Sequence, residues 1–150
     1  MKFFTALLIL LIAAFASAQS PLFSNCTADT TDLTVTSFTM TPYPLCINQN
    51  VCITITGTLS EPITSGAALS MQGKYLSRVV YADRQDLCTV LAASGYSCPI
   101  PATTTSITFC LLVTSTIPNV PVILKIQATN GNDYPLFCVS STITASVCSS

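Results

Sequence analysis

The sequence predicts an all-β fold, an antiparallel two-sheet sandwich held together by disulfide bonds. Apolar and polar residues alternate along several segments of the chain, a pattern typical of strands with one buried face. About seven such segments, rich in Thr, Val and Ile, are separated by Pro, Gly and Asn turns, as in a β-sandwich. The chain has eight cysteines, and an even number in an oxidising compartment indicates four disulfides.

The predicted strands follow one another along the chain. Their ranges are 33–40, 51–59, 67–71, 74–81, 105–113, 122–127 and 137–147. Residues 84–94 carry Leu87, Val90 and Leu91 at helical spacing and end at Gly95, so one short helix is expected there. Successive side chains of a strand point to opposite faces. The apolar residues that this alternation turns inward are Val51, Ile53, Ile55, Leu69, Met71, Ile107, Phe109, Leu111, Val122, Leu124 and Ile126.

The same alternation turns some cysteines outward. Cys110 lies between two inward residues, and Cys138 and Cys148 face outward if Phe137 and Val147 face inward. Such cysteines fit bridges at the sheet margins. The chain has no Trp, whereas an immunoglobulin domain packs a Trp against a disulfide that crosses its core. An immunoglobulin domain itself is therefore not expected.

The N-terminus predicts export. Lys2 precedes an apolar run from Phe3 to Phe15, and small residues follow up to Ala18, as in a cleaved signal peptide. We expect residues 1–18 to be the signal peptide and residues 19–150 to be one domain. Asn25-Cys26-Thr27 is a sequon for N-glycosylation at Asn25.

Composition excludes several function classes. The chain has no histidine, which removes the usual general base and the Ser-His and Cys-His pairs. No Gly-rich phosphate loop and no cysteine spacing for zinc are present, so no enzyme, cofactor or metal site is expected. Asp83 and Asp86 are interpreted as a turn residue and a helix start. The four cations of residues 19–150 form no basic stripe, which argues against nucleic acid and against stable electrostatic docking to a membrane.

A set of short motifs carries a family resemblance. In chain order they are Pro42-Tyr43-Pro44-Leu45-Cys46, Cys52, Ile63-Thr64-Ser65-Gly66-Ala67, Asp86-Leu87-Cys88, Cys98-Pro99-Ile100, Ile117-Pro118 and Leu136-Phe137-Cys138. Their order and spacing resemble the ML (MD-2-related lipid-recognition) family. Within that family the sequence is similar to the phosphatidylglycerol/phosphatidylinositol transfer proteins and the Niemann–Pick type C sterol carriers. The resemblance spans residues 26–147.

The resemblance implies an immunoglobulin-like sandwich whose two sheets enclose a lipid. It implies the disulfides Cys26–Cys138, Cys46–Cys52 and Cys88–Cys98, and we expect the two remaining cysteines to form a fourth, Cys110–Cys148. The inward residues named above then become candidates for lipid contact. Tyr96 and Pro99 join them as candidates for the pocket mouth.

Two functions remain open from the sequence. The first is a lipid carrier, secreted or lumenal in an endolysosomal compartment, that acts as a monomer and contacts membranes transiently. Its cargo would be a phospholipid or a sterol. The second is a secreted structural or adhesive sandwich whose apolar residues fill a solid core, because alternation alone does not distinguish a packed sandwich from a hollow one.

Overall fold

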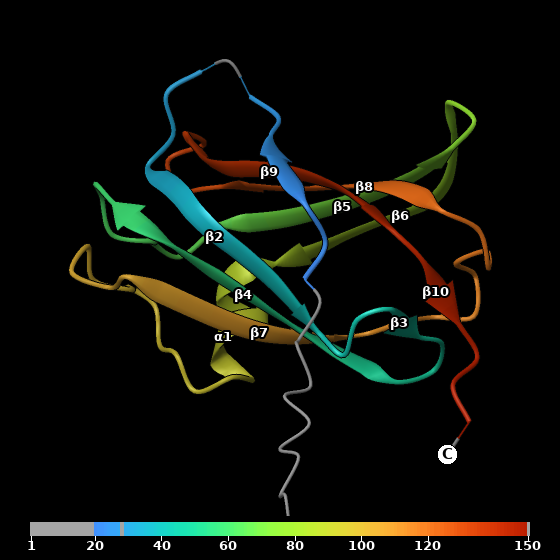
Figure 1. Ribbon diagram of the computed structural model, residues 1–150. Coiled ribbons are helices and arrows are strands. Elements are labelled where there is room, and N and C mark those ends of the chain that lie inside the picture. The colour runs from blue at the N-terminus through green and yellow to red at the C-terminus, as the bar shows by residue number, and fades with distance from the viewer. Residues whose placement is uncertain (1–19, 28, 150) are drawn as a thin grey trace, which may run out of the picture.

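Two antiparallel sheets form the body of the molecule in the computed structural model, which describes residues 20–27 and 29–149 (Figure 1). The larger sheet has the strand order β1-β9-β8-β5-β6 and the smaller one β2-β4-β7. A short parallel ladder joins β3 to β10. The elements are β1 (Phe23–Asn25), β2 (Leu33–Thr41), β3 (Leu45–Cys46), β4 (Asn50–Leu59), β5 (Ala68–Tyr75), β6 (Arg78–Asp86), α1 (Leu87–Ala92), β7 (Ser106–Leu112), β8 (Val122–Thr129), β9 (Pro135–Ile143) and β10 (Ala145–Ser146).

The all-β prediction is confirmed, with some differences at the strand ends. The segment expected as one strand over 137–147 divides into β9 and β10, and Val147 is 81 % exposed rather than inward. The two short strands β1 and β3 carry too few residues to show an alternation. In the described part of the chain, no helix combines the length and apolarity needed to cross a bilayer.

The predicted helix is shorter than expected because β6 continues through Asp86. The Asp86 carboxylate accepts a hydrogen bond from the Thr89 backbone N–H at 2.7 Å, which satisfies one of the free donors of the first turn. Leu87, Val90 and Leu91 are buried as the helical spacing predicts. α1 therefore packs against the edge of the sandwich through one apolar face.

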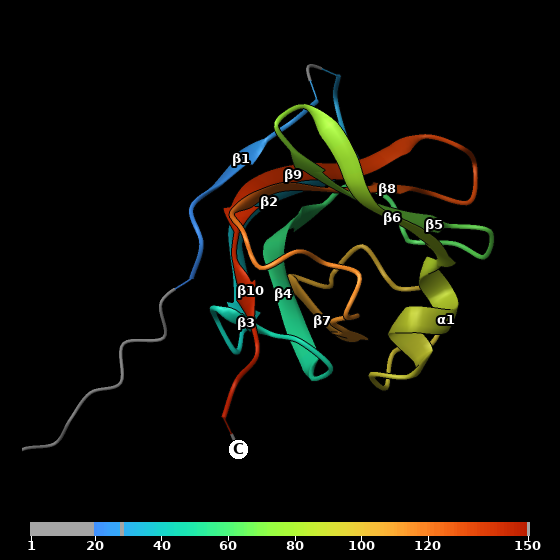
Figure 2. The same ribbon diagram turned by 90° about the vertical axis from the view of Figure 1, so that its right-hand side faces the viewer.

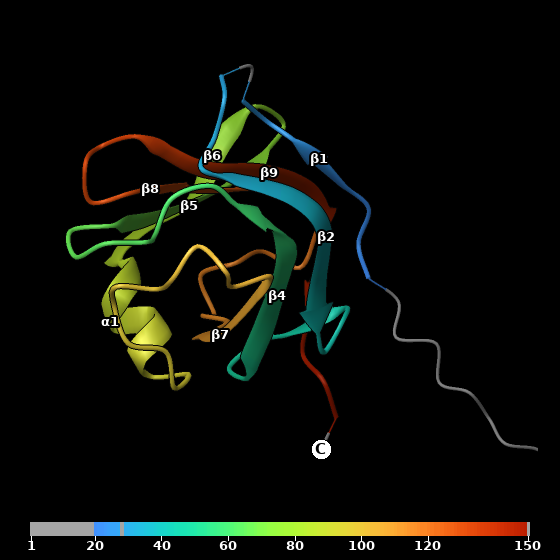
Figure 3. The same cartoon turned by 90° about the vertical axis from the view of Figure 1, so that its left-hand side faces the viewer.

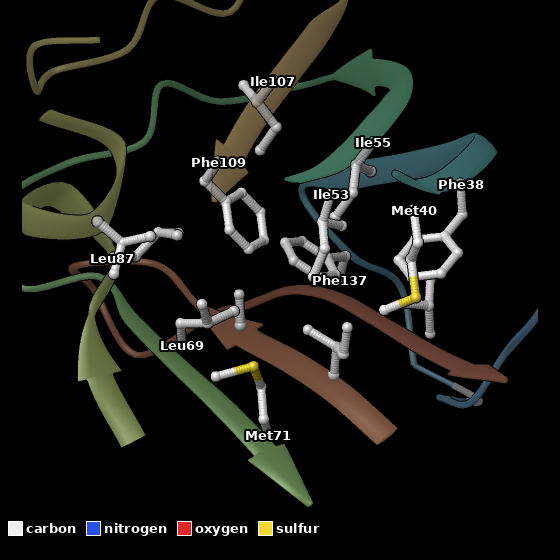
Figure 4. Close-up of a cluster of buried hydrophobic side chains, with 14 of the residues drawn as sticks. Phe38, Met40, Ile53, Ile55, Leu69, Met71, Leu87, Ile107, Phe109 and Phe137 are labelled. Atoms are coloured by element: carbon white, nitrogen blue, oxygen red, sulfur yellow. The ribbon is translucent and has the colours of Figure 1, made fainter. Parts of the chain in front are cut away.

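The core lies between the sheets. Ile53 and Phe109 of the smaller sheet face Leu69 and Phe137 of the larger one (Figure 4), and all four side chains are no more than 1 % exposed. Strand register sets this arrangement, because Ile53 pairs directly with Phe109 across β4 and β7. Both residues then point to the same face.

The two long sides of the sandwich differ. On one side β2 contacts β9, and the β3–β10 ladder ties the chain after β2 to the chain after β9. On the other side the edge strands β6 and β7 are bridged by α1, which contacts both (Figure 2). We call the first side the hinge side and the second the α1 side.

The two ends of the sandwich also differ. Strand directions place the segments 26–27, 29–32, 60–67, 86–105 and 130–134 together at one end, which we call the closed end (Figure 3). The 42–49 and 113–121 loops, the β5–β6 turn and the chain from 144 to 149 lie at the other, which we call the open end (Figure 2). At the closed end the Asn130 side chain donates to Asp32 and to the Pro62 carbonyl oxygen, each at 2.9 Å, and accepts from the Thr64 backbone N–H. One buried amide thus joins three of the loops there.

Four disulfides link the described residues, and two of them correct the prediction. Cys26 is bonded to Cys138 and Cys88 to Cys98, the pairs that the resemblance implies. The expected pairs Cys46–Cys52 and Cys110–Cys148 are wrong in this structure, where Cys46 is bonded to Cys148 and Cys52 to Cys110.

Strand register explains the corrected pairing. Cys52 and Cys110 are direct cross-strand partners on β4 and β7, with their Cα atoms 4.0 Å apart. The parallel β3–β10 ladder pairs Cys46 with Ser146, and this brings Cys148 within bonding reach, at a Cα–Cα distance of 5.4 Å. Residues opposite each other on neighbouring strands are close enough for a disulfide.

Candidate functional site

An apolar cavity of about 40 Å³ lies between the sheets toward the open end. Both sheets contribute to its wall, which also includes the start of the 113–121 loop. The lining residues are Met40, Leu45, Val51, Ile53, Met71, Tyr81, Leu111, Leu112, Val113, Ile117, Leu124 and Ile143. None of them is charged, so the wall resembles the interior of a bilayer more than it resembles an enzyme site.

The cavity reaches the surface on the α1 side, between the edge strands β6 and β7. Tyr81 on β6 and Leu111 on β7 are half-buried, and Leu112 is 58 % exposed. α1 begins after the far end of β6, so it bridges the strands toward the closed end and leaves this stretch uncovered. We call the gap between Tyr81 and Leu111–Val113 the mouth.

Tyr81 supplies the one polar side-chain group in the cavity wall. Burial raises the pKa of its hydroxyl above the ordinary value of 10.0, and the nearby Asp83 carboxylate raises it further. The hydroxyl therefore keeps its proton at neutral pH and is able to donate a hydrogen bond at the mouth.

Five of the residues predicted to touch lipid line this cavity: Val51, Ile53, Met71, Leu111 and Leu124. Ile55 and Ile107 instead line a second cavity of about 10 Å³ near the closed end. Leu69, Phe109, Val122 and Ile126 are buried between the sheets and line neither cavity.

Tyr96 and Pro99 lie apart from the mouth. The Tyr96 hydroxyl accepts a hydrogen bond from the Thr108 backbone N–H at 3.2 Å, and its ring packs against the core as a half-buried side chain. It therefore covers the free edge of β7. Pro99 is exposed in the loop between α1 and β7. This loop belongs to the closed end, whereas the cavity opens at the other.

Sequence reasoning did not select seven of the lining residues: Met40, Leu45, Tyr81, Leu112, Val113, Ile117 and Ile143. Ile143 and Met40 lie on strands that were predicted, so alternation could have found them. Leu45 and Ile117 occur in the motifs that carried the resemblance. Tyr81 and Leu112 sit at sheet edges, and no local pattern marks a residue as facing a gap between two sheets.

The cavity is smaller than a typical ligand pocket. Small-molecule pockets usually measure roughly 300–1,000 Å³, far above the 40 Å³ found here. The hinge side carries the β3–β10 ladder and the Cys46–Cys148 bond. In the described residues, no disulfide joins β6 to β7 across the mouth. Separation of the sheets at the mouth would therefore break mainly side-chain contacts.

This fold and cavity define a class of protein, the ML domain family. The chain belongs to it, because the ML domain family model matches residues 21–145.

Particular relatives are similar along most of their length. A protein of Dictyostelium discoideum, named as a candidate phosphatidylglycerol/phosphatidylinositol transfer protein 2, is 28 % identical over 144 residues, which is 96 % of this chain and 99 % of that one. A phosphatidylglycerol/phosphatidylinositol transfer protein of Neurospora crassa is 28 % identical over 128 residues, with 83 % of this chain and 72 % of that one covered.

Solved structures show the same fold at low identity. A Niemann–Pick type C2 protein from the Japanese carpenter ant superposes with a TM-score of 0.65 at 12 % identity and covers 83 % of this chain and 99 % of its own. Chicken MD-1, solved in complex with lipid IVa, gives a TM-score of 0.52 at 12 % identity and covers 81 % of this chain and 86 % of its own.

Proposed function

We propose that this protein binds one phospholipid with its acyl chains between the sheets and transfers it between membranes. The observation that carries the proposal is the uncharged cavity at the mouth, walled by both sheets and open to the surface. The names of the Dictyostelium and Neurospora relatives support phosphatidylglycerol or phosphatidylinositol as the cargo. Export by the predicted signal peptide, whose residues lie outside the described part of the chain, would place the protein outside the cell or in an organelle lumen.

The energetics favour an apolar interior over direct contact with water. Each buried methylene is worth about 0.8 kcal/mol, so a 16-carbon chain gains on the order of 13 kcal/mol on leaving water. This gain must exceed the cost of separating the sheets at the mouth. Met40 and Met71 lie on opposite sheets in the cavity wall, and their flexible side chains repack at low cost around a guest.

A second candidate function rests on the small size of the cavity. At 40 Å³ the interior is nearly filled, as in a structural or adhesive sandwich that binds no ligand. The two candidates differ in one observable property, namely whether lipid accompanies the folded protein.

Native mass spectrometry of the secreted protein, before and after organic extraction, separates them. The carrier proposal expects a mass excess of one phospholipid that extraction removes. The excess mass would also reveal a sterol, should that be the cargo. A bare mass together with no uptake from phospholipid or sterol vesicles would leave the structural sandwich standing.

A matched pair of variants tests the position of the site. Leu111→Trp puts a large side chain into the cavity from the half-buried edge of β7, and we expect lipid uptake to fall at least tenfold. Ile123→Trp is the control, because Ile123 is 55 % exposed and the inward positions of β8 are its neighbours Val122 and Leu124. Equal uptake by the two variants, both with the wild-type unfolding midpoint, would mean that lipid binds elsewhere.

A further inference from the structure

Charge is unevenly divided between the two ends of the molecule. The loops of the closed end carry Asp29, Asp32, Glu61, Asp86 and Asp133, and Arg84 lies two residues before Asp86 on β6. The open end carries Lys74 and Arg78, both exposed on the β5–β6 hairpin, and its described residues include no acid. The linear sequence hides this separation, because strands that run back and forth bring distant acids to one end.

Exposed apolar side chains gather at the cationic end. Leu76 is 78 % exposed and Val79 52 % exposed on the β5–β6 hairpin, which projects from the sandwich (Figures 1 and 2). Leu112 at the mouth and Val147 after β10 are 58 % and 81 % exposed. Single exposed apolar residues are ordinary, whereas two on one projecting hairpin form a local apolar tip, a feature that fits an interaction surface.

The turn of the hairpin holds Leu76 outward. Leu76 and Ser77 have φ angles of 47° and 66°, the left-handed conformation that two-residue hairpin turns require and that Asn and Gly usually supply. A leucine there is conformationally costly and gains no burial in return. Backbone strain of this kind is characteristic of functional sites.

We propose that the open end docks on an anionic phospholipid bilayer, with Leu76 and Val79 in the interface and with Lys74 and Arg78 against the phosphates. The proposal rests on the function proposed above and adds to it the surface and the lipid charge that the protein recognises. The occupant follows from charge complementarity and from continuity with the mouth, since Tyr81 lies on the same strand as Arg78 and Val79. Docking in this orientation places the mouth at the membrane surface.

Distance allows this orientation despite the net negative charge of the chain. Arg78 and Asp86 are the first and last residues of β6, and at about 3.3 Å per residue they lie roughly 26 Å apart. The Debye length at physiological salt is about 8 Å. The acids of the closed end are therefore screened from a membrane that touches the open end.

Two arginines on β6 provide a matched test. Arg78→Glu and Arg84→Glu make the same change in net charge at exposed positions of one strand. We expect Arg78→Glu to weaken binding to phosphatidylcholine vesicles that contain phosphatidylglycerol by roughly 25-fold, since each cation near a membrane surface contributes about fivefold. Arg84→Glu should change it less than twofold. Equal effects of the two substitutions would overturn the proposal.

Lipid composition and the apolar tip provide the second test. Wild-type protein should bind vesicles of phosphatidylcholine alone at least tenfold more weakly than vesicles with phosphatidylglycerol, and equal binding would refute recognition of an anionic surface. Leu76→Ser should weaken binding to the anionic vesicles, whereas Tyr134→Ser, at an exposed residue of the closed end, should not. Equal effects of these two substitutions would refute insertion of the hairpin.

Cargo and docking are measured separately, so their failures are distinguishable. Native mass spectrometry reports bound lipid without a membrane, and vesicle co-sedimentation reports docking without transfer. If the protein carries lipid but Arg78→Glu does not weaken its co-sedimentation with vesicles, the docking surface is refuted and the carrier function stands. If the protein carries no lipid but Arg78→Glu weakens its co-sedimentation, the carrier function is refuted and the docking surface stands.

Discussion

Removal of the Cys46–Cys148 disulfide should destabilise the protein more than removal of Cys88–Cys98. The first bond joins residues 102 positions apart and the second joins residues 10 positions apart. Because Cys26–Cys138 stays bonded in the variant, the shortest covalent loop that Cys46–Cys148 closes runs through that bond and has about 30 residues. In the chain-entropy model the two closures then correspond to about 3.7 and about 2.7 kcal/mol. We therefore expect the double variant Cys46→Ala/Cys148→Ala to lose about 1 kcal/mol more than Cys88→Ala/Cys98→Ala. Either loss is a large fraction of the roughly 5–15 kcal/mol by which a domain of this size is stable.

Equilibrium unfolding in urea, with the remaining disulfides intact, measures both losses. The disulfide pairing itself is tested with a single variant. In Cys148→Ala, Cys46 should be the free thiol. Peptide mapping that instead finds Cys46 bonded to Cys52 would refute the pairing. If the Cys46/Cys148 variant loses no more free energy of unfolding than the Cys88/Cys98 variant, loop length does not explain how much each disulfide stabilises the protein.

Three further predictions concern single residues. Asn130→Ala removes a side chain that is 2 % exposed and leaves the Thr64 N–H without its acceptor, so it should cost about 1–3 kcal/mol in urea unfolding; an unchanged midpoint would contradict the structural role of this amide. Gly57→Ala would put a Cβ atom 2.1 Å from the Thr34 carbonyl oxygen. The backbone must then shift, which should cost about 1–3 kcal/mol of stability in urea unfolding. A variant as stable as wild type would show that β2 and β4 can move apart there at little cost. Two hydrogen bonds from Thr89 lower the pKa of Asp86 below 3.8, and the one from the Thr89 backbone N–H has a larger effect than the one from its hydroxyl. The ionised carboxylate is therefore favoured in the folded state, and the stability it contributes is present above pH 3.8 and lost as the pH falls through the lowered pKa. Asp86→Asn keeps a capping side chain but cannot titrate, so its melting temperature should be below wild type at pH 7 and converge with it at low pH; a constant difference across this range would contradict the assignment.

Local pattern in the sequence was sufficient to predict the strands and their buried faces. Val51, Ile53, Leu69 and Ile126 are all buried as the alternation indicates, because the period of two follows from the backbone geometry of each strand alone. The short helix was predictable for the same reason: Leu87, Val90 and Leu91 share a face at helical spacing. The family was also predictable, since its motifs are short and lie in a fixed order.

The disulfide pairing shows where local reasoning ends. Alternation indicated correctly that Cys110 lies on the outer face, and it gives the same face to Cys52, between Val51 and Ile53. The choice of partner depended on the register between β4 and β7, which aligns Cys52 with Cys110. Register is a property of two strands together, so neither segment encodes it by itself.

The sequence by itself determined the class of fold, the apolar composition of the interior and the absence of histidine chemistry. Only the tertiary structure decided which of the apolar residues border a cavity, that the cavity opens between Tyr81 and Leu111, and that five acids from distant loops meet at the end opposite Lys74 and Arg78. The physical reason is the same in each case. Burial in a strand follows from spacing along the chain, whereas a mouth, a cross-strand bond and a charged end arise where edges and loops distant in the chain meet in space.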